Sequence, residues 1–322
     1  MTGDQSAQQP ASGGTATAVG GIEVASVRRA FGSVLAVDDI SLTARPGEVT
    51  ALVGPNGAGK TTLLLMLATL LVPDHGTIRI DGFDPVTQPG EVRARIGWMP
   101  DGFGTWDALT VREVLHTIAA AYRMGPVEAR ARTEAILELL HLGDLADRRA
   151  RVLSRGQKQR LGLARALIHD PSVLLLDEPA SGLDPRSRIE LRDVLRSMAA
   201  EGKTILVSSH ILTELQEVAD RAVIVARGRT TESQTLDAVE LATTVGSWRI
   251  TSLDPDRLRS WLHDHHVPWR AELAAVEVEV GGDEQAARLL ADLVADGIRI
   301  TAFAPSQGAL EAAYLAATED RQ

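Results

Sequence analysis

The nine residues Gly54–Thr62 (GPNGAGKTT) constrain the fold of this 322-residue chain more than any other segment. They lie directly after the apolar run Val49–Val53 and directly before a second apolar run that begins at Leu63. Glycines let the backbone approach a ligand closely, and the following helix points its positive N-terminal end at the same place. The pattern G-x-x-x-x-G-K-[ST] between a strand and a helix predicts a nucleotide phosphate site, with Lys60 on the phosphates and Thr61 on Mg²⁺. The expected contacts come from the whole loop: Gly54, Pro55, Asn56, Gly57, Ala58, Gly59, Lys60, Thr61 and Thr62.

A second buried strand ends in two carboxylates. The run Val173–Leu176 is wholly apolar, and Asp177, Glu178 and Pro179 follow it. An aspartate at such a strand end is placed to bind Mg²⁺ beside the phosphate loop, so we expect Asp177 to be a metal ligand. Glu178 is expected to orient or deprotonate a water molecule at the terminal phosphate. If the phosphate loop were not present, this pair of acids would be just as typical of a helix cap or an exposed surface as of a metal site.

A third segment, Leu153–Gln157 (LSRGQ), has two interpretations. Ser154 followed three residues later by Gln157 is a capping-box pattern, which stabilises a helix start by about 1 kcal/mol. The other interpretation is a second helix N-terminus that receives an anion, where Gly156 permits close approach of the backbone. The residues alone leave both interpretations open.

The composition excludes several classes of protein. The chain has no Cys, which rules out a disulfide scaffold, a Cys-based zinc site and a Cys nucleophile. The longest apolar run, Leu63–Val72, is about half as long as the roughly 20 residues that span a bilayer, and residues 1–20 lack the pattern of a secretory signal. The net charge is −10, and residues 236–322 hold 15 acidic and 7 basic side chains. We therefore expect no nucleic-acid partner.

The order of the apolar runs predicts an α/β fold. Short apolar runs alternate with helical patterns, which is typical of a mainly parallel core sheet covered by helices. From about 100 to 170 the pattern is helical and predicts an inserted helical subdomain. The predicted organisation is a disordered tail (1–20), this α/β domain (21–230), a linker (231–246) and a small α+β C-terminal accessory domain (247–322). The last part has a βαββαβ-like order and ends in a predicted helix near 307–317.

Together these motifs resemble, in order and spacing, those of the ATP-binding cassette (ABC) family. Gly54–Thr61 matches its Walker A motif, Leu153–Gln157 its signature and Val173–Asp177 its Walker B motif. The resemblance covers about residues 22–230 and implies an ATPase that uses ATP and Mg²⁺. It also implies further site residues, namely Phe31 stacked on adenine, the D-loop Ser181, Gly182, Leu183 and Asp184, and a switch histidine, His210, that is catalytic together with Glu178.

Two positions depart from the family pattern. Asp101 stands where the family usually has Gln, and its carboxylate is expected to supply an oxygen toward Mg²⁺. Arg155 occupies the first variable Gly of the signature. In this family the signature contacts ATP that is bound to the Walker A motif of a second cassette. We expect Ser154, Gly156 and Gln157 to preserve that contact.

The resemblance implies two kinds of partner. In this family two cassettes associate head to tail, so that each ATP lies between the Walker A motif of one copy and the signature of the other. Most single-cassette chains of this family serve a separate multi-spanning membrane subunit. The resemblance therefore implies a cytoplasmic homodimer that the membrane subunit holds at the inner face of the cell membrane. Trp98, Phe103 and Trp106, beside Asp101, are a candidate docking groove for that subunit, with packing beneath the helical subdomain as the alternative.

The C-terminal residues favour export. Residues 302–315 resemble the end of bacterial two-component drug- and antibiotic-resistance exporters, so the expected cargo is a drug, an antibiotic or a lipid-like molecule. The alternatives are an importer ATPase with a regulatory C-terminal domain and a soluble ABC ATPase of DNA repair or translation. A catalytically inactive cassette is opposed by the presence of Lys60, Asp177, Glu178 and His210.

Overall fold

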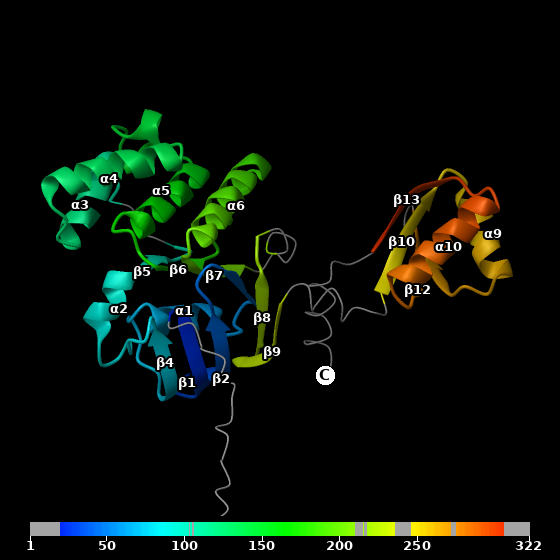
Figure 1. Cartoon of the computed structure of the whole chain (residues 1–322), viewed down its shortest axis with the longest axis horizontal. Coiled ribbons are helices and arrows are strands. Elements are labelled where there is room, and N and C mark those ends of the chain that lie inside the picture. Colours follow the sequence, from blue (N-terminus) through cyan, green and yellow to red (C-terminus); the bar gives the residue numbers. More distant parts are fainter. Residues whose placement is uncertain are drawn as a thin grey trace, which may run out of the picture.

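The computed structural model describes residues 20–102, 104, 106–209, 215, 218–235, 246–271 and 275–305. Nine strands form one sheet in the order β4-β1-β2-β9-β8-β3-β7-β6-β5 (Figure 1). Their bounds are β1 Ile22–Phe31, β2 Val34–Ala44, β3 Val49–Val53, β4 His75–Ile80, β5 Ile96–Met99, β6 Val173–Asp177, β7 Thr204–Ser209, β8 Arg221–Ala226 and β9 Arg229–Thr235. The accompanying helices are α1 Lys60–Leu67, α2 Pro89–Arg95, α3 Val111–Ala121, α4 Pro126–Leu139, α5 Arg155–Leu167 and α6 Pro185–Ala200, with 3₁₀ turns η1 Gly143–Leu145 and η2 Ala150–Val152.

The central strands β3, β6 and β7 are buried along their whole length. They pair in parallel, and the register places Val53 beside Ser209 and Asp177 beside Ser208. Because parallel strands end at the same edge of a sheet, the loop after β3 and the carboxylate at the end of β6 meet there.

The pairing confirms the α/β fold with a mainly parallel core sheet, formed by β5, β6, β7, β3 and β8. The antiparallel strands β1, β2 and β4, which extend the sheet, were not predicted. Their apolar side chains form one core with α1 and the parallel strands. Helix α1 is therefore enclosed on several sides, which accounts for its nearly all-apolar sequence after the second threonine.

Helices cover the opposite face of the parallel strands. Side chains of α5 and α6 share a core with β3, β6 and β7, and α3 and α4 pack onto α5 (Figure 1). Helices α3, α4 and α5 are the predicted helical insertion between β5 and β6, whereas α6 follows β6. Both α3 and α5 begin with a capping box, from Thr110 to Glu113 and from Ser154 to Gln157.

Strand β9 corrects the predicted linker at 231–246. Residues 229–235 pair in antiparallel fashion with β8 across the turn Arg227-Gly228, whose φ angles are 51° and 76°. Two consecutive residues with positive φ form the tight turn that suits the twist of a hairpin. The sequence of β9, RTTESQT, contains no aliphatic residue, so the apolar pattern that marks a buried strand is missing.

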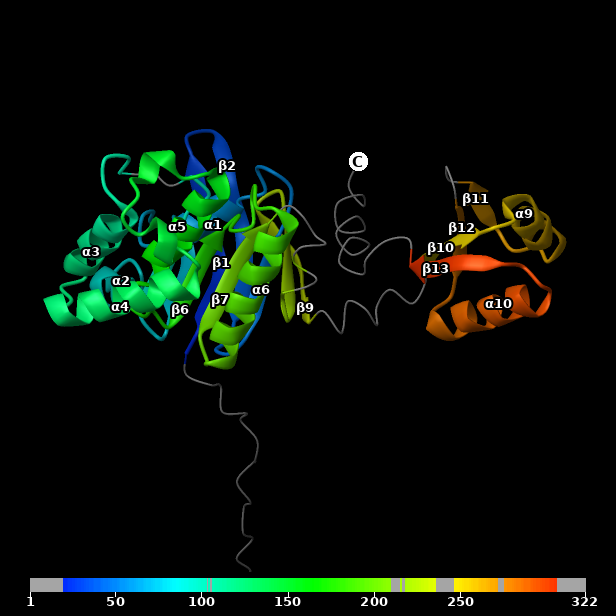
Figure 2. The same cartoon turned by 90° about the horizontal axis from the view of Figure 1, so that it is seen from above.

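Residues 246–305 form a second, four-stranded sheet in the order β11-β12-β10-β13 (Figure 2). Its elements are β10 Gly246–Ser252, α9 Pro255–Asp264, β11 Trp269–Ala271, β12 Val276–Val280, α10 Asp283–Ala295 and β13 Ile300–Pro305, which confirms the predicted βαββαβ order. Both helices pack on the face that presents Ile250, Val276 and Val278. The predicted helix at 307–317 and the tail, except for Gly20, lie outside the described residues. Within the part of the chain that the structure describes, no helix combines the length and hydrophobicity needed to span a bilayer.

Candidate functional site

The loop between β3 and α1 is closely confined by neighbouring backbone. Gly59, the N-cap residue of α1, has φ 103°, and a Cβ atom there would lie 2.6 Å from the carbonyl oxygen of Ala36. A Cβ atom on Gly54 would lie 2.2 Å from the carbonyl oxygen of Val225. Glycine is therefore the residue that fits at both positions, because β2 and β8 leave no room for a side chain.

Lys60 lies inside this loop and is 7% exposed. Its Nζ atom donates hydrogen bonds to the carbonyl oxygens of Gly54 (2.5 Å) and Pro55 (3.2 Å). Burial lowers the pKa of the Lys60 ammonium, and the charges of Glu178 and Asp177 oppose this shift. The loop thus contains a cation at the end of β3, where the N–H groups at the start of α1 also point.

A hydroxyl and a carboxylate meet beside Lys60. Thr61 Oγ1 donates a hydrogen bond to Asp177 Oδ2 (3.0 Å), and Ser208 Oγ donates to Asp177 Oδ1 (2.5 Å). A hydroxyl and a buried carboxylate are hard oxygen donors of the kind that Mg²⁺ prefers, so Thr61 and Asp177 fit this ion. Ser208 is on the neighbouring strand β7 and fixes the orientation of the carboxylate.

Glu178 follows Asp177 in an unusual backbone conformation, with φ 52°. Its N–H donates to the carbonyl oxygen (3.2 Å) and the Oγ atom (3.1 Å) of Ser208. Its own carbonyl oxygen accepts a hydrogen bond from Gln159 Nε2 (3.0 Å). Ser208 and Gln159 were missed at the sequence level, because a polar residue inside a strand or helix carries no pattern that reveals its partner.

These groups surround one open cavity of about 380 Å³. It is lined by residues Pro55–Thr62, by Val34, Leu35 and Ala36 of β2, and by three carboxylates, Asp101, Asp177 and Glu178. The structure therefore places Asp101 in the lining of the same cavity as the phosphate loop. A cavity with a buried lysine, helix N–H groups and a hydroxyl–carboxylate pair that fits Mg²⁺ at one edge can bind a nucleoside triphosphate.

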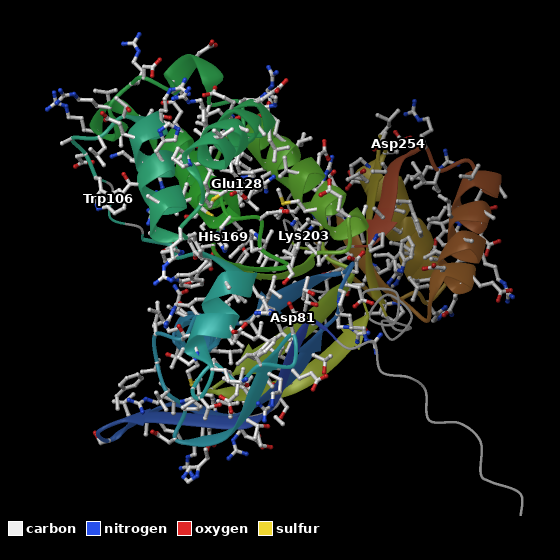
Figure 3. All side chains as sticks on the ribbon, turned by 60° about the vertical axis from the view of Figure 1, so that its left-hand side comes forward. Asp81, Trp106, Glu128, His169, Lys203 and Asp254 are labelled. Atoms are coloured by element: carbon white, nitrogen blue, oxygen red, sulfur yellow. The ribbon has the colours of Figure 1, made fainter. Side chains whose placement is uncertain are left out.

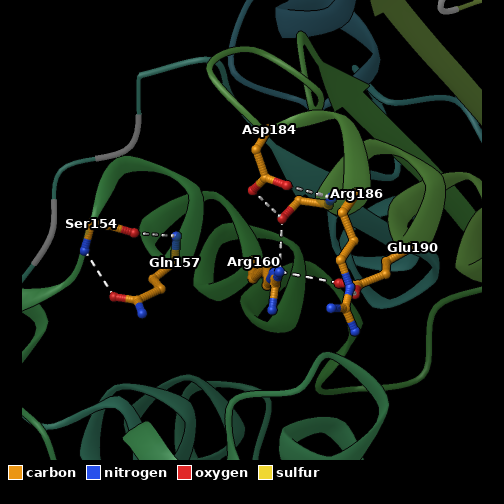
Figure 4. Close-up of polar contacts among 7 residues, drawn as sticks. Ser154, Gln157, Arg160, Asp184, Arg186 and Glu190 are labelled. Carbon is orange, nitrogen blue, oxygen red and sulfur yellow. Dashed lines mark hydrogen bonds and ion pairs between the residues drawn. The ribbon is translucent and has the colours of Figure 1, made fainter.

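Other predicted site residues are not among those that line this cavity. Phe31 ends β1 and is 47% exposed, with the guanidinium of Arg29 4.9 Å from its ring centre. The four signature residues, Ser154 to Gln157, form the start of α5 and do not line the cavity. Both hydrogen bonds of the capping box are present, Ser154 N–H to Gln157 Oε1 (2.9 Å) and Gln157 N–H to Ser154 Oγ (3.3 Å) (Figure 4). His210 lies outside the described residues.

The D-loop residues lead from Glu178 into α6. Asp184 caps this helix by accepting hydrogen bonds from the N–H (3.0 Å) and the hydroxyl (2.6 Å) of Ser187 (Figure 4). Arg160 of α5 donates to the same hydroxyl (2.8 Å) and forms an ion pair with Glu190 (3.1 Å). Ser181, Gly182 and Leu183 lie against the first turn of α5.

A mainly parallel sheet with a phosphate-binding loop, a carboxylate at the end of another parallel strand and an inserted helical part defines a nucleotide-binding cassette. Residues 37–181 match the family described as ABC transporter. The daunorubicin/doxorubicin resistance ATP-binding protein of Streptomyces peucetius is 32% identical over an alignment of 313 residues, and the match covers 92% of this chain and 92% of that one. The ABC transporter ATP-binding protein NatA of Bacillus subtilis is 43% identical over 61% of this chain and 80% of its own length. The chain belongs to the ABC transporter family and is an ATP-binding subunit of this type.

A solved structure supports ATP hydrolysis. The dimeric, post-hydrolysis structure of the ATP-binding cassette MJ0796 with ADP and Pi has a TM-score of 0.61 and 26% identity, and the match covers 66% of this chain and 98% of that one. The family membership and this structural match identify the chain as an ATPase that binds ATP.

Proposed function

We propose that this chain powers the export of a small molecule, a drug, an antibiotic or a lipid-like compound, through a separate membrane subunit. The observation that carries the proposal is the match to the S. peucetius resistance protein. That match covers 92% of both chains, so it extends beyond the cassette into the residues of the second sheet. The NatA match covers only 61% of this chain.

Each group at the cavity has a role in this proposal. Lys60 and the N–H groups of Gly57–Thr62 bind the phosphates, and Thr61 and Asp177 hold Mg²⁺, with Asp101 nearby. The metal neutralises charge that develops on the phosphates. Glu178 orients the attacking water, and Phe31, which is exposed at the end of β1, stacks on adenine. His210 is proposed as the second catalytic residue on the resemblance alone.

ATP-dependent dimerisation explains the position of the signature. The start of α5 has the N–H groups of an anion site, yet Ser154 and Gly156 do not line the cavity of their own chain. A second copy that brings its ATP to this helix end would use both sites at once. The dimeric MJ0796 cassette supports this arrangement.

Of the described residues of the candidate docking groove, Trp106 is the one that is exposed enough to meet a membrane subunit. This residue is 45% exposed at the edge of the molecule, with the guanidinium of Arg165 5.9 Å from its ring centre (Figure 3). Trp98, by contrast, is partly buried against the core of β1 and α1, so it packs internally. Phe103 lies outside the described residues. We propose that Trp106 contacts the membrane subunit and holds the chain at the inner face of the membrane.

The test is affinity purification of the tagged Glu178→Gln chain from its native host in mild detergent with ATP and Mg²⁺. This variant should bind ATP, hydrolyse it very slowly and remain dimeric. We expect a stoichiometric multi-spanning membrane protein in the eluate. The matched control is the double variant Glu178→Gln/Lys60→Met, which should be monomeric.

Three outcomes would contradict parts of the proposal. A ribosomal or DNA-repair partner without a membrane protein would replace the transporter role. An additional extracytoplasmic binding protein in the complex would indicate import. Hydrolysis by Glu178→Gln at the wild-type rate would exclude Glu178 as the base.

A further inference from the structure

Two side chains on one face of α5 reach the same turn of the chain. Arg155 and Gln159 are four residues apart and therefore lie one above the other on the helix. Arg155 Nη2 donates a hydrogen bond to Ser181 Oγ (2.9 Å), and Gln159 Nε2 donates to the carbonyl oxygen of Glu178 (3.0 Å). Both contacts hold residues 178–182, which follow β6 and carry the candidate base.

This turn needs external support because its first residue is strained. A φ of 52° costs a residue such as Glu178 on the order of 1 kcal/mol and persists only where neighbouring groups fix it. Ser208 holds the N–H of Glu178, while Gln159 and the N–H of Ser181 (3.1 Å) hold its carbonyl oxygen. Loss of the contacts from α5 would let Glu178 turn away from the cavity.

The side chain of Arg155 lies directly over the D-loop. A Cβ atom on Gly182, whose φ is +73°, would lie 2.4 Å from Arg155 Nε. A Cβ atom on Gly156 would lie 3.4 Å from Leu183 Cδ2, so the next residue of α5 touches the same loop. The arginine that departs from the family pattern thus contacts its own chain.

We propose that Arg155 and Gln159 are positioning residues for Glu178. In the proposed dimer, the start of α5 faces the ATP of the second copy. The same helix also holds the turn that carries Glu178, the proposed base for the chain's own ATP. A shift of α5 when it meets that ATP moves Glu178 through these two contacts. The inference rests on the proposed ATP-bound dimer and on Glu178 as the base.

The experiment is steady-state ATPase kinetics of the full-length chain and of Arg155→Ala, Ser181→Ala and their double variant. We expect Arg155→Ala to lower kcat about tenfold and to change KM for ATP less than twofold, because the phosphate loop is intact. Ser181→Ala should have a similar effect, and the double variant should be no slower than the slower single variant, since both remove one contact. Arg151→Ala is the matched control, because Arg151 is an exposed arginine of η2 outside the site, and its kcat should equal the wild-type value.

A second variant tests the other contact. Gln159→Glu has nearly the same shape, but its ionised carboxylate cannot donate to a carbonyl oxygen, so kcat should fall without a change in KM. Thermal unfolding shows whether this buried substitution folds, and if it does not, the Arg155–Ser181 cycle alone decides.

A raised KM with unchanged kcat, or effects of Arg155→Ala and Ser181→Ala that multiply in the double variant, would mean that Arg155 does not act through Ser181. Glu178→Gln in the same assay separates the two proposals. If it hydrolyses ATP at the wild-type rate, the base assignment fails; if it is inactive and the cycle is multiplicative, only the positioning role fails.

Discussion

Thr61 Oγ1 lies 3.0 Å from Asp177 Oδ2, although the two residues are 116 positions apart in the sequence. The parallel register of β3, β7 and β6 is the reason, because it brings the ends of these strands to one edge of the sheet. Ser208 binds the other oxygen of Asp177 and so limits rotation of the carboxylate. The sheet itself therefore sets the spacing of the proposed metal ligands.

Asp177→Asn should weaken the binding of Mg²⁺ together with ATP. The amide keeps the shape of the side chain but removes the charge that attracts the ion, so we expect at least a tenfold higher Mg²⁺ concentration at half-saturation. The measurement is a titration of Mg²⁺ into the protein with a fluorescent ATP analogue. Thr61→Ser, which keeps the hydroxyl, should remain near wild type; an unchanged Mg²⁺ dependence in Asp177→Asn would contradict the assignment.

Lys60→Met should reduce ATP affinity by roughly 100-fold, or about 3 kcal/mol, because a charged hydrogen-bond donor to the phosphates is lost. Methionine preserves most of the length of the buried stem, so the fold should survive. Equilibrium binding of ATP to the wild type and to Lys60→Met measures the loss of affinity, and urea unfolding of the two proteins shows whether the fold is preserved. Micromolar affinity in a folded Lys60→Met protein would show that the loop binds phosphate without this cation.

The loop Gly54–Thr62 and the aspartate beside it were predictable, since glycine spacing and an apolar run ending in Asp177 are local patterns. Ser208 and Gln159 were not, because their partners come from the register of β7 and the packing of α5. Strand β9 was missed for a related reason, as its polar sequence is held by pairing with β8 across the turn at Gly228. In each case a contact between distant segments decides the structure, and the local sequence carries no sign of it.

Trp106→Ser should abolish transport in a reconstituted system while leaving basal ATPase activity within twofold of wild type. Trp106 is almost half exposed, so its removal should cost the fold little. The control is Val294→Ser, which changes an exposed apolar residue on α10 and should leave both activities unchanged. Equal loss of transport and ATPase activity in Trp106→Ser would indicate a packing role instead.

His169 links the end of α5 to the start of β5. Its ring stacks on Tyr122, with centres 3.6 Å apart, and its Nε2 atom lies 2.9 Å from the carbonyl oxygen of Ile96. Because a carbonyl oxygen only accepts, Nε2 carries the proton in the neutral ring. Burial lowers the pKa of His169 from 6.5 to about 4, and the hydrogen bond to Ile96 opposes this shift.

Acid should therefore destabilise the protein through His169. Between pH 6.5 and about 4 the unfolded chain binds a proton at this residue and the folded chain does not, so the free energy of unfolding falls as the pH drops through this range. The side chain is partly exposed, so we expect a loss on the order of 2 kcal/mol. Urea unfolding at pH 7 and pH 4.5 measures it, with His169→Gln as the matched variant, because glutamine can still donate to Ile96 but does not titrate. The wild type should lose more stability than His169→Gln over this interval, and equal losses in the two proteins would show that His169 is protonated in the folded state as readily as in the unfolded chain.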